Sequence, residues 1–323
     1  MKSAVAFRST PFSHASVERS LFETHAGRSY QIVRELGRGG MGVIFLARDV
    51  TLHRLVAIKV MRHELSSSAE ECERFRREAR IAAQLRHDGI VAVHGFGETG
   101  GLLYMVMEFI RGEPLAARIA RAGRMDPTEV REILASLAET LEYAHAEGIV
   151  HRDLKPENIV LDRESGRPML TDFGVALSRS RDPVRGESSR AFGTPHFMSP
   201  EQAAGELDLD GRSDVYSLGV LGYLMVTGEP PFSAPHFAAI ASKHISEAHV
   251  PIRERVAGVP ADLATAIDRC LEKLPECRFA SASDFAAALT KSYNRSHRHK
   301  WVSAALRSAV LIASAFGLAG GQG

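Results

Sequence analysis

Residues 151–158 concentrate side chains that could move a proton or bind a charged substrate. They read His-Arg-Asp-Leu-Lys-Pro-Glu-Asn and lie between two apolar runs, residues 148–150 and 159–161. Because a polar loop between apolar segments costs free energy to fold, such a loop is expected to have a function. Asp153 is a candidate to accept a proton from a hydroxyl group, and Lys155 could offset charge on a phosphoryl group during its transfer.

Two oxygen ligands for a divalent cation accompany this loop. Asn158 ends it, and Asp172 stands 19 residues after Asp153 in the sequence Thr-Asp-Phe-Gly. An amide carbonyl and a carboxylate are hard oxygen ligands of the kind that Mg²⁺ accepts. Taken singly, each of these residues also fits a loop side chain that caps a turn. Together they favour a metal-assisted site for phosphoryl transfer.

Residues 37–42 read Gly-Arg-Gly-Gly-Met-Gly and lie between two strand-like runs, residues 30–36 and 43–47. Because a β-branched and aromatic run follows the glycines where a dinucleotide fingerprint needs a helix, we interpret them as the turn of a hairpin. Backbone N–H groups in such a loop can approach phosphate oxygens closely, since no Cβ intervenes. A plain hairpin turn is the alternative for this loop taken alone.

Lys59 interrupts an apolar strand-like run at residues 55–60. A lysine in this setting either reaches solvent at an edge or has a dedicated partner. Glu78 lies beside the core-facing positions of a predicted helix over residues 70–85, so we expect it to pair with Lys59. The spacing alone is weak support, because many helices carry such a glutamate.

The order of the predicted elements indicates two lobes. Up to residue 109 the chain has strand patterns with one inserted helix, and the first break follows at residues 110–114. Beyond it the periodicity is mostly helical, and the apolar stretch at residues 215–227 predicts a buried central helix. We therefore predict an α+β protein with a small β-rich lobe and a larger helical lobe.

Composition narrows the function classes. The 323 residues are 45% apolar and 24% charged, with a net charge of +1, which gives no electrostatic argument for a nucleic-acid partner. The three cysteines lack close pairing, which argues against disulfides and for a reducing compartment. Residues 1–29 show no sustained helical or strand periodicity, and we predict that they form a flexible arm. They also lack the apolar core of a signal peptide.

These motifs together resemble those of a bacterial eukaryotic-like (Hanks-type) serine/threonine protein kinase. The resemblance covers about residues 30–293, and its motifs occur in the family's order. They are the glycines at 37–42, Val-Ala-Ile-Lys at 56–59, Glu78, residues 151–158, Asp-Phe-Gly at 172–174 and Ser-Pro-Glu at 199–201. The resemblance implies a bilobal protein-kinase fold with an N-lobe at 30–110 and a C-lobe at 111–293, preceded by an arm at 1–29 and followed by a segment at 294–323.

The resemblance also assigns roles at matching positions. ATP contacts are implied for Gly37, Gly39, Gly42, Val43, Ala57, Lys59, Glu78, Glu108, Ile110 and Val160. Among them, Lys59 would hold the α- and β-phosphates, the side chains of Val43, Ala57 and Val160 would enclose the adenine, and Glu108 and Ile110 would offer backbone hydrogen bonds. Catalytic roles are implied for Asp153, Lys155 and Thr194, and Mg²⁺ (or Mn²⁺) ligation for Asn158 and Asp172. Structural roles are implied for a Glu201–Arg278 pair and for Asp214 beneath the loop.

The expected activity is ATP-dependent phosphorylation of serine and threonine hydroxyls on proteins. Lys-Pro-Glu at 155–157 is the serine/threonine version of the family's loop. The alternatives are a nucleotide-binding pseudokinase scaffold and a small-molecule kinase. The presence of Lys59, Asp153 and Asp172 argues against the scaffold, and the Ser-Pro-Glu segment, a peptide-docking feature of protein kinases, argues against the small-molecule kinase.

Arg152 precedes Asp153, as in kinases that are switched by phosphorylation of the segment between Asp172 and Glu201. A phosphate added there could pair with Arg152 and order the segment. We predict autophosphorylation at Ser188 or Ser189, for which a kinase-domain homodimer is a candidate partner. The alternative is a segment whose serines only keep it soluble.

Residues 295–300 are basic, and residues 301–320 are mostly apolar with Arg307 as an interruption. A basic flank before an apolar run suggests a single membrane-spanning segment with the kinase domain in the cytoplasm. The uninterrupted apolar part, residues 308–320, is shorter than the roughly 20 residues that a span needs. An amphipathic or free tail is the alternative.

Overall fold

The structure is a computed structural model that describes residues 17–173 and 195–290. The chain divides into two compact units. The sheet unit contains the described residues up to Ala83 and residues 92–109, and the helical unit contains residues 84–91 and those from Ile110 onward. Within the described ranges, the elements confirm the predicted α+β class, because one unit is built on a sheet and the other mainly on helices.

The sheet unit is a five-stranded antiparallel sheet in the order β1-β2-β3-β5-β4. Its strands are β1 (Tyr30–Arg38), β2 (Gly42–Asp49), β3 (Arg54–Met61), β4 (Val93–Thr99) and β5 (Leu102–Glu108). Its helices are α1 (Val17–Ala26), a short 3₁₀ turn η1 (His63–Leu65) and α2 (Ala69–Ala82). The β1–β2 connection carries the glycines of residues 37–42, as the hairpin interpretation predicted.

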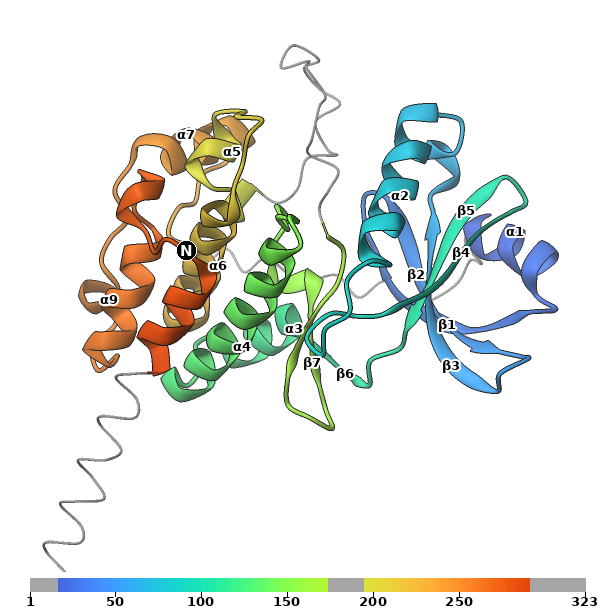
Figure 1. Cartoon of the computed structure of the whole chain (residues 1–323), viewed down its shortest axis with the longest axis horizontal. Coiled ribbons are helices and arrows are strands. Elements are labelled where there is room, and N and C mark those ends of the chain that lie inside the picture. Colours follow the sequence, from blue (N-terminus) through green and yellow to red (C-terminus); the bar gives the residue numbers. More distant parts are fainter. Residues whose placement is uncertain (1–16, 174–194, 291–323) are drawn as a thin grey trace, which may run out of the picture. The chain divides into compact units, whose positions relative to one another are not determined.

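The two α-helices lie on opposite faces of this sheet (Figure 1). On one face, Lys59 of β3 and Met105 of β5 are register partners, and Lys59 reaches Glu78 of α2. On the other face, Phe22 of α1 meets the ring of Tyr104 edge-on, with 5.1 Å between ring centroids. The side chains of successive strand residues alternate between faces, which separates the α2 side of the sheet from the α1 side.

The prediction of a flexible arm at residues 1–29 is wrong for residues 17–26, which form α1. The helix buries Glu18, Phe22 and Ala26, which follow one another at intervals of four residues and therefore share one helix face. Phe22 is completely buried in the apolar cluster on this side of the sheet. The helical period is difficult to recognise in the sequence because one of the three inward positions is a glutamate.

The helical unit has the following elements. Its helices are α3 (Leu115–Ala122), α4 (Pro127–Ala146), α5 (Pro200–Ala203), α6 (Gly211–Thr227), α7 (Phe237–Ser246), α8 (Ile252–Arg255), α9 (Ala261–Cys270) and a helical stretch at 282–290. Its strands are β6 (Gly112–Pro114), β7 (Ile159–Asp162) and β8 (Pro168–Leu170), and its 3₁₀ turns are η2 (Pro156–Asn158), η5 (Pro195–Phe197) and η6 (Pro275–Cys277).

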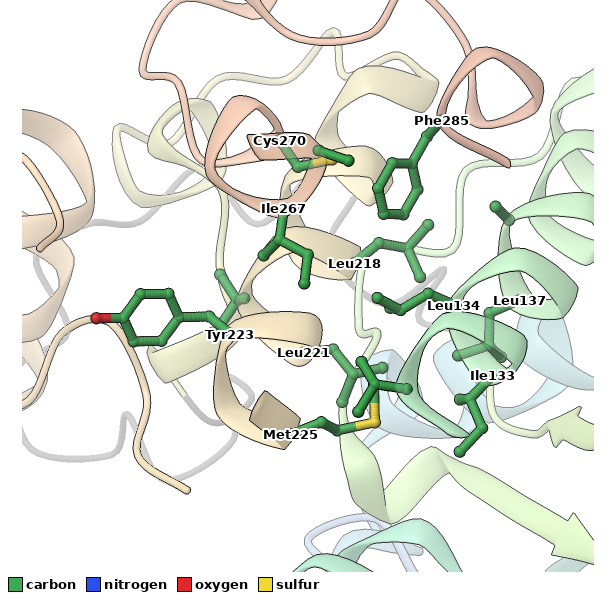
Figure 2. Packing of buried hydrophobic residues seen from close by; sticks show 14 of the residues in the cluster. Ile133, Leu134, Leu137, Leu218, Leu221, Tyr223, Met225, Ile267, Cys270 and Phe285 are labelled. Atoms are coloured by element: carbon green, nitrogen blue, oxygen red, sulfur yellow. The ribbon is translucent and has the colours of Figure 1, made fainter. Parts of the chain in front are cut away.

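Helix α6 is the buried centre of the helical unit, as its apolar sequence predicted. It packs between α4 and α9, and Figure 2 shows Leu134, Leu221 and Ile267 of these three helices meeting in the core. At Gly222 an added Cβ would lie 2.9 Å from Leu134 Cδ1 and 3.1 Å from Ile267 Cδ1. The glycine therefore allows the three helices to approach closely.

Membrane insertion receives no support from the described ranges, where no helix is both long enough and apolar enough to cross a bilayer. The predicted spanning segment at residues 301–320 lies outside the described residues.

Candidate active site

The loop at residues 151–158, called the catalytic loop below, is held at its start by Asp214. This aspartate lies in the first turn of α6 and is completely buried. The backbone N–H of His151 donates to Asp214 Oδ2 at 2.8 Å, and that of Arg152 donates to Oδ1 at 2.9 Å. Arg152 has a φ of 67°, which a non-glycine residue adopts only where its surroundings hold it there. The predicted brace from Asp214 is thus confirmed.

Asp214 also has a side-chain partner in α4. His145 Nε2 lies 2.7 Å from Asp214 Oδ2. Burial alone would raise the pKa of Asp214, but hydrogen bonding and charge from His145 lower the pKa overall. The pKa of His145 is correspondingly raised, because the Asp214 carboxylate outweighs the effect of burial. In its protonated form, His145 compensates the buried charge that holds the catalytic loop.

The ring of His151 packs beneath the loop as a neutral group. Complete burial lowers its pKa, and its Nε2 lies 3.3 Å from the carbonyl oxygen of Thr171. Its ring centroid is 4.7 Å from that of Phe173. His151 thus joins the catalytic loop to the segment that carries Asp172, without itself facing solvent.

Asp153, Lys155 and Asn158 form one hydrogen-bonded group. Lys155 Nζ donates to Asp153 Oδ2 at 2.6 Å, and Asn158 Nδ2 donates to the same oxygen at 3.0 Å. Asn158 Nδ2 also donates to the Asp153 carbonyl at 2.9 Å. The side-chain nitrogen of Asn158 therefore donates only to Asp153 in these contacts. Its side-chain oxygen, Oδ1, is left to accept a hydrogen bond or to ligate a cation.

Asp172 is placed next to Asn158 by the backbone. The N–H of Thr171 donates to the Asn158 carbonyl at 2.9 Å, and Thr171 Oγ1 donates to the same oxygen at 3.2 Å. Asp172 has a φ of 53°, a conformation that costs free energy for a non-glycine residue and is common at functional sites. A side-chain amide oxygen and a carboxylate on adjacent segments fit a hard divalent cation such as Mg²⁺.

In the sheet unit, the predicted Lys59–Glu78 pair is confirmed. Lys59 Nζ donates to Glu78 Oε1 at 2.6 Å, and both side chains are buried. Helix α2 presents Glu78 because it starts at the N-cap Ser68, whose hydroxyl accepts the N–H of Glu71 at 3.3 Å. The buried pair holds the ammonium group of Lys59 in one position on the α2 face of the sheet.

The loop at residues 37–42, called the glycine-rich loop below, is shaped by backbone contacts. Gly39 N–H donates to the Gly42 carbonyl at 2.8 Å, and Arg62 N–H donates to the Met41 carbonyl at 3.1 Å. At Gly42 an added Cβ would lie 2.6 Å from the carbonyl oxygen of Val60, so the hairpin requires glycine there. At Gly37 and Gly40 it would meet nothing within 4 Å, and these glycines leave open space along the loop.

The strand register corrects one predicted adenine contact. Val43 pairs with Val60 across β2 and β3 and is fully buried in the apolar cluster on the α1 face. Its neighbour Ile44 pairs with Lys59 and so lies on the α2 face with Lys59 and Ala57. Because neighbouring strand residues point to opposite faces, Ile44 replaces Val43 as the candidate adenine contact.

The other predicted contacts are distributed as follows. Ala57 pairs with Met107 on the Lys59 face, and Glu108 ends β5 with its N–H donated to the Ala92 carbonyl at 2.9 Å. A ligand could therefore use the carbonyl of Glu108 but not its N–H. Ile110 and Val160 belong to the helical unit, where Val160 is a half-buried residue of β7. Thr194, Ser188 and Ser189 lie outside the described residues.

Sequence reasoning missed Gln202. Its Nε2 donates to the Arg152 carbonyl at 2.7 Å, and its Oε1 accepts the N–H of Ser199 at 3.0 Å in a capping box of α5. The adjacent predicted pair is confirmed, because Arg278 contacts both Glu201 oxygens at 2.7 and 2.8 Å. The Ser-Pro-Glu-Gln pattern with glutamine at N3 is itself the signal that could have identified this second support of the loop.

Comparisons with known proteins agree with this arrangement. The family model described as "Protein kinase domain" matches residues 30–293. The serine/threonine-protein kinase PknB of Mycobacterium tuberculosis (strain ATCC 25618 / H37Rv) is 39% identical over 277 residues, which are 84% of this chain and 44% of that protein. PknA of M. tuberculosis (strain ATCC 25177 / H37Ra) is 40% identical over 271 residues, 82% of this chain and 61% of that protein. The chain thus spans about half the length of these curated relatives.

A crystal structure of the M. tuberculosis PknI kinase domain is similar to this chain with a TM-score of 0.66 at 29% sequence identity. The alignment covers 84% of this chain and 97% of that one. The predicted protein-kinase fold is thereby confirmed.

Proposed function

The chain belongs to the protein kinase family, and from this premise we propose that it transfers the γ-phosphate of ATP to serine or threonine hydroxyls of proteins. The observation that carries the proposal is the group formed by Asp153, Lys155 and Asn158 on a loop held by buried Asp214. The carboxylate can accept the proton of an acceptor hydroxyl, and the adjacent ammonium group can offset charge on a transferring phosphoryl group. The side-chain amide of Asn158 holds the carboxylate in place.

Within the helical unit, we assign the steps as follows. Asp153 accepts the proton of the substrate hydroxyl while that oxygen forms its bond to the γ-phosphorus. The bond between this phosphorus and the oxygen that bridges it to the β-phosphate breaks, and ADP leaves. Lys155 offsets negative charge on the phosphoryl group during the transfer. Asn158 and Asp172 would hold Mg²⁺, or Mn²⁺ as an alternative, through their side-chain oxygens. When bound, the cation would neutralise charge on the phosphate oxygens. Thr194 is assigned to the presentation of the acceptor hydroxyl.

Within the sheet unit, the residues proposed to bind ATP serve its phosphates and its base. Lys59, held by Glu78, would contact the α- and β-phosphates, and the backbone N–H groups of the glycine-rich loop would also approach these phosphates. Ala57 and Ile44 share the Lys59 face and are proposed to contact the adenine, together with Val160 of the helical unit. The carbonyl of Glu108 and the backbone of Ile110 are proposed hydrogen-bonding positions.

We propose a kinase domain at residues 30–293, a regulated segment between Asp172 and Glu201, and a membrane-proximal segment from residue 294. Phosphorylation at Ser188 or Ser189, in trans within a kinase-domain homodimer, would add charge for Arg152 to bind. Peptide mapping after incubation with ATP tests this, and the absence of phosphate between residues 172 and 201 would contradict it. Membrane fractionation of the full chain against a 1–294 truncation tests whether a cytoplasmic kinase domain is anchored to a membrane.

The proposed activity is tested by transfer of labelled γ-phosphate to a generic protein substrate, followed by phosphoamino-acid analysis. We expect label on serine and threonine with wild type and a loss of at least about 100-fold with Asp153→Asn, because the proton acceptor is removed. If wild type and variant both bind ATP and are equally inert, the chain is a nucleotide-binding scaffold. If label enters only small molecules, the substrate class is wrong.

A further inference from the structure

Helix α1 precedes the region that matches the family model, which begins at residue 30. It nevertheless packs closely on the sheet unit, where Phe22 enters the apolar cluster with Tyr30 and Tyr104. Figure 1 shows α1 beside β1 and β4, on the side of the sheet opposite α2. The helix is therefore part of the folded unit, although it lies before the region that the family model matches.

The inward face of α1 carries a carboxylate as well as apolar groups. Glu18 has a side-chain exposure of only 4%, and its Oε2 lies 3.3 Å from Nη1 of Arg38. Arg38 stands between Gly37 and Gly39 in the glycine-rich loop, and it pairs with Val43 in the β1–β2 register. That register directs Arg38 to the α1 face, so the contact follows from the alternation of the strands.

A second contact joins Glu18 to the other side of the hairpin. The N–H of His63 lies 3.5 Å from Glu18 Oε1, at the start of the turn between β3 and α2. The preceding N–H, that of Arg62, donates to the Met41 carbonyl in the glycine-rich loop. Glu18 therefore contacts a residue within the loop and the segment that holds the loop's tip.

The remaining partner of Arg38 is Glu35 of the same strand. Arg38 Nη2 lies 3.2 Å from Glu35 Oε2, and both of these side chains are partly exposed. A pair within one strand cannot fix that strand against the rest of the unit. Glu18 can, because α1 is anchored separately by Phe22 in the core.

We propose that α1 positions the glycine-rich loop for ATP through the Glu18–Arg38 ion pair, with Glu18 as a positioning residue. This inference rests on the proposed function, since it concerns the loop assigned to the phosphates. Removing the carboxylate leaves Arg38 paired with Glu35 of its own strand, so the loop's first arm loses its contact with α1 and ATP must order it on binding. The effect falls on nucleotide binding, while the catalytic loop, which belongs to the other unit, keeps its own supports.

The test measures the dissociation constant of ATP with MgCl₂ by titration of the full chain, and kcat and KM for ATP with a protein substrate. For Glu18→Gln we expect the dissociation constant and KM to rise about threefold to tenfold, with kcat within about twofold. Glu23→Gln is the matched control on the same helix, because Glu23 pairs with Arg19 on the solvent side. It should leave both constants unchanged.

Two further variants separate positioning from general stability. Phe22→Leu weakens the packing of α1 but keeps the carboxylate, so it should lower the melting temperature and leave the dissociation constant within about twofold. Arg38→Gln combined with Glu18→Gln should weaken ATP binding no more than Arg38→Gln alone.

The outcomes that would overturn the inference are distinct from failure of the proposed function. An unchanged dissociation constant in Glu18→Gln, or an equal rise in Phe22→Leu, overturns the inference alone. If the effects of Glu18→Gln and Arg38→Gln on the dissociation constant of ATP are additive, the ion pair is not the cause of the weaker binding. If wild type itself binds no ATP, the proposed function and the inference both fail.

Discussion

The catalytic loop and the glycine-rich loop are held by different kinds of contact. Beneath the catalytic loop, Asp214 is completely buried and accepts two of the loop's backbone N–H groups. The glycine-rich loop is shaped by the backbone of its own hairpin, and an added Cβ at Gly37 or Gly40 would meet nothing within 4 Å. Asp214 holds the backbone of the catalytic loop directly, whereas the buried Glu18 contacts the glycine-rich loop through the side chain of Arg38, and that loop has open space at Gly37 and Gly40.

The difference matches what each loop must do. A proton acceptor works only in a narrow range of positions, so a rigid support is useful beneath Asp153. A loop that covers a nucleotide must admit it and release it, which favours contacts that can open. The comparison suggests that changes beneath the catalytic loop reduce the transfer rate, whereas changes in the glycine-rich loop weaken ATP binding.

Asp214→Asn should have a strong effect on the transfer rate. The variant keeps the shape of the side chain but loses one of the two oxygens that accept the N–H groups of His151 and Arg152. We expect kcat to fall by about 100-fold with KM for ATP within about threefold, because Asp153 is displaced while the sheet unit is untouched. Steady-state kinetics with varied ATP provide the measurement.

Thr227→Val is the matched control for Asp214→Asn, since Thr227 is a buried polar residue at the far end of α6. It should change stability but not kcat. A rise in KM for ATP as large as the fall in kcat would contradict a division of labour between the loops.

A smaller effect is expected from Gly42→Ala. Its Cβ would lie 2.6 Å from the Val60 carbonyl, so the hairpin must shift to accommodate it. We expect KM for ATP to rise about tenfold, with kcat reduced by less than about threefold. Gly40→Ala, whose Cβ has open space, should raise KM less. If the two variants behave alike, the protein's own packing does not determine the loop's shape.

The smallest effect concerns pH. The pKa of His145 is raised above its ordinary value of 6.5 by the Asp214 carboxylate, against the effect of burial. The contribution of the His145–Asp214 pair to the free energy of unfolding is therefore complete below pH 6.5, and it is lost as the pH rises through the folded-state pKa of His145. His145→Gln should lower the free energy of unfolding by about 1 kcal/mol more near pH 6 than near pH 9. Denaturant titrations at both pH values measure this, and an equal loss at both would show that His145 is neutral.

Most of the site could be predicted from sequence because its residues are polar in apolar surroundings. Lys59 is a charged residue in an apolar strand, which indicates that it needs a partner, and Glu78 on the following helix could be predicted as that partner. Asp214 was assigned by family resemblance. The sequence of α6 does not show that the aspartate in its first turn bonds the backbone of Arg152, 62 positions earlier.

The failures have physical causes. Val43 was assigned to the adenine by family resemblance, but the β2–β3 register pairs Val43 with Val60 and Ile44 with Lys59, which places Val43 on the α1 face. Helix α1 was missed because its inward stripe contains Glu18, whose burial depends on Arg38 twenty positions away. Gln202 was missed because Ser-Pro-Glu-Gln indicates only a capping box, and that pattern does not show that the glutamine amide also bonds the carbonyl of Arg152, 50 positions earlier.

A single-turnover measurement tests whether Asp153 is the proton acceptor in phosphoryl transfer. Wild type and Asp153→Asn are saturated with ATP and MgCl₂, bound nucleotide is quantified, and the rate of γ-phosphate transfer to a serine-containing protein is followed after mixing. We expect equal nucleotide occupancy and a transfer rate at least about 100-fold lower in the variant, because only the proton acceptor is lost. Equal transfer rates at equal occupancy would contradict the assignment of Asp153 and the catalytic role of its loop.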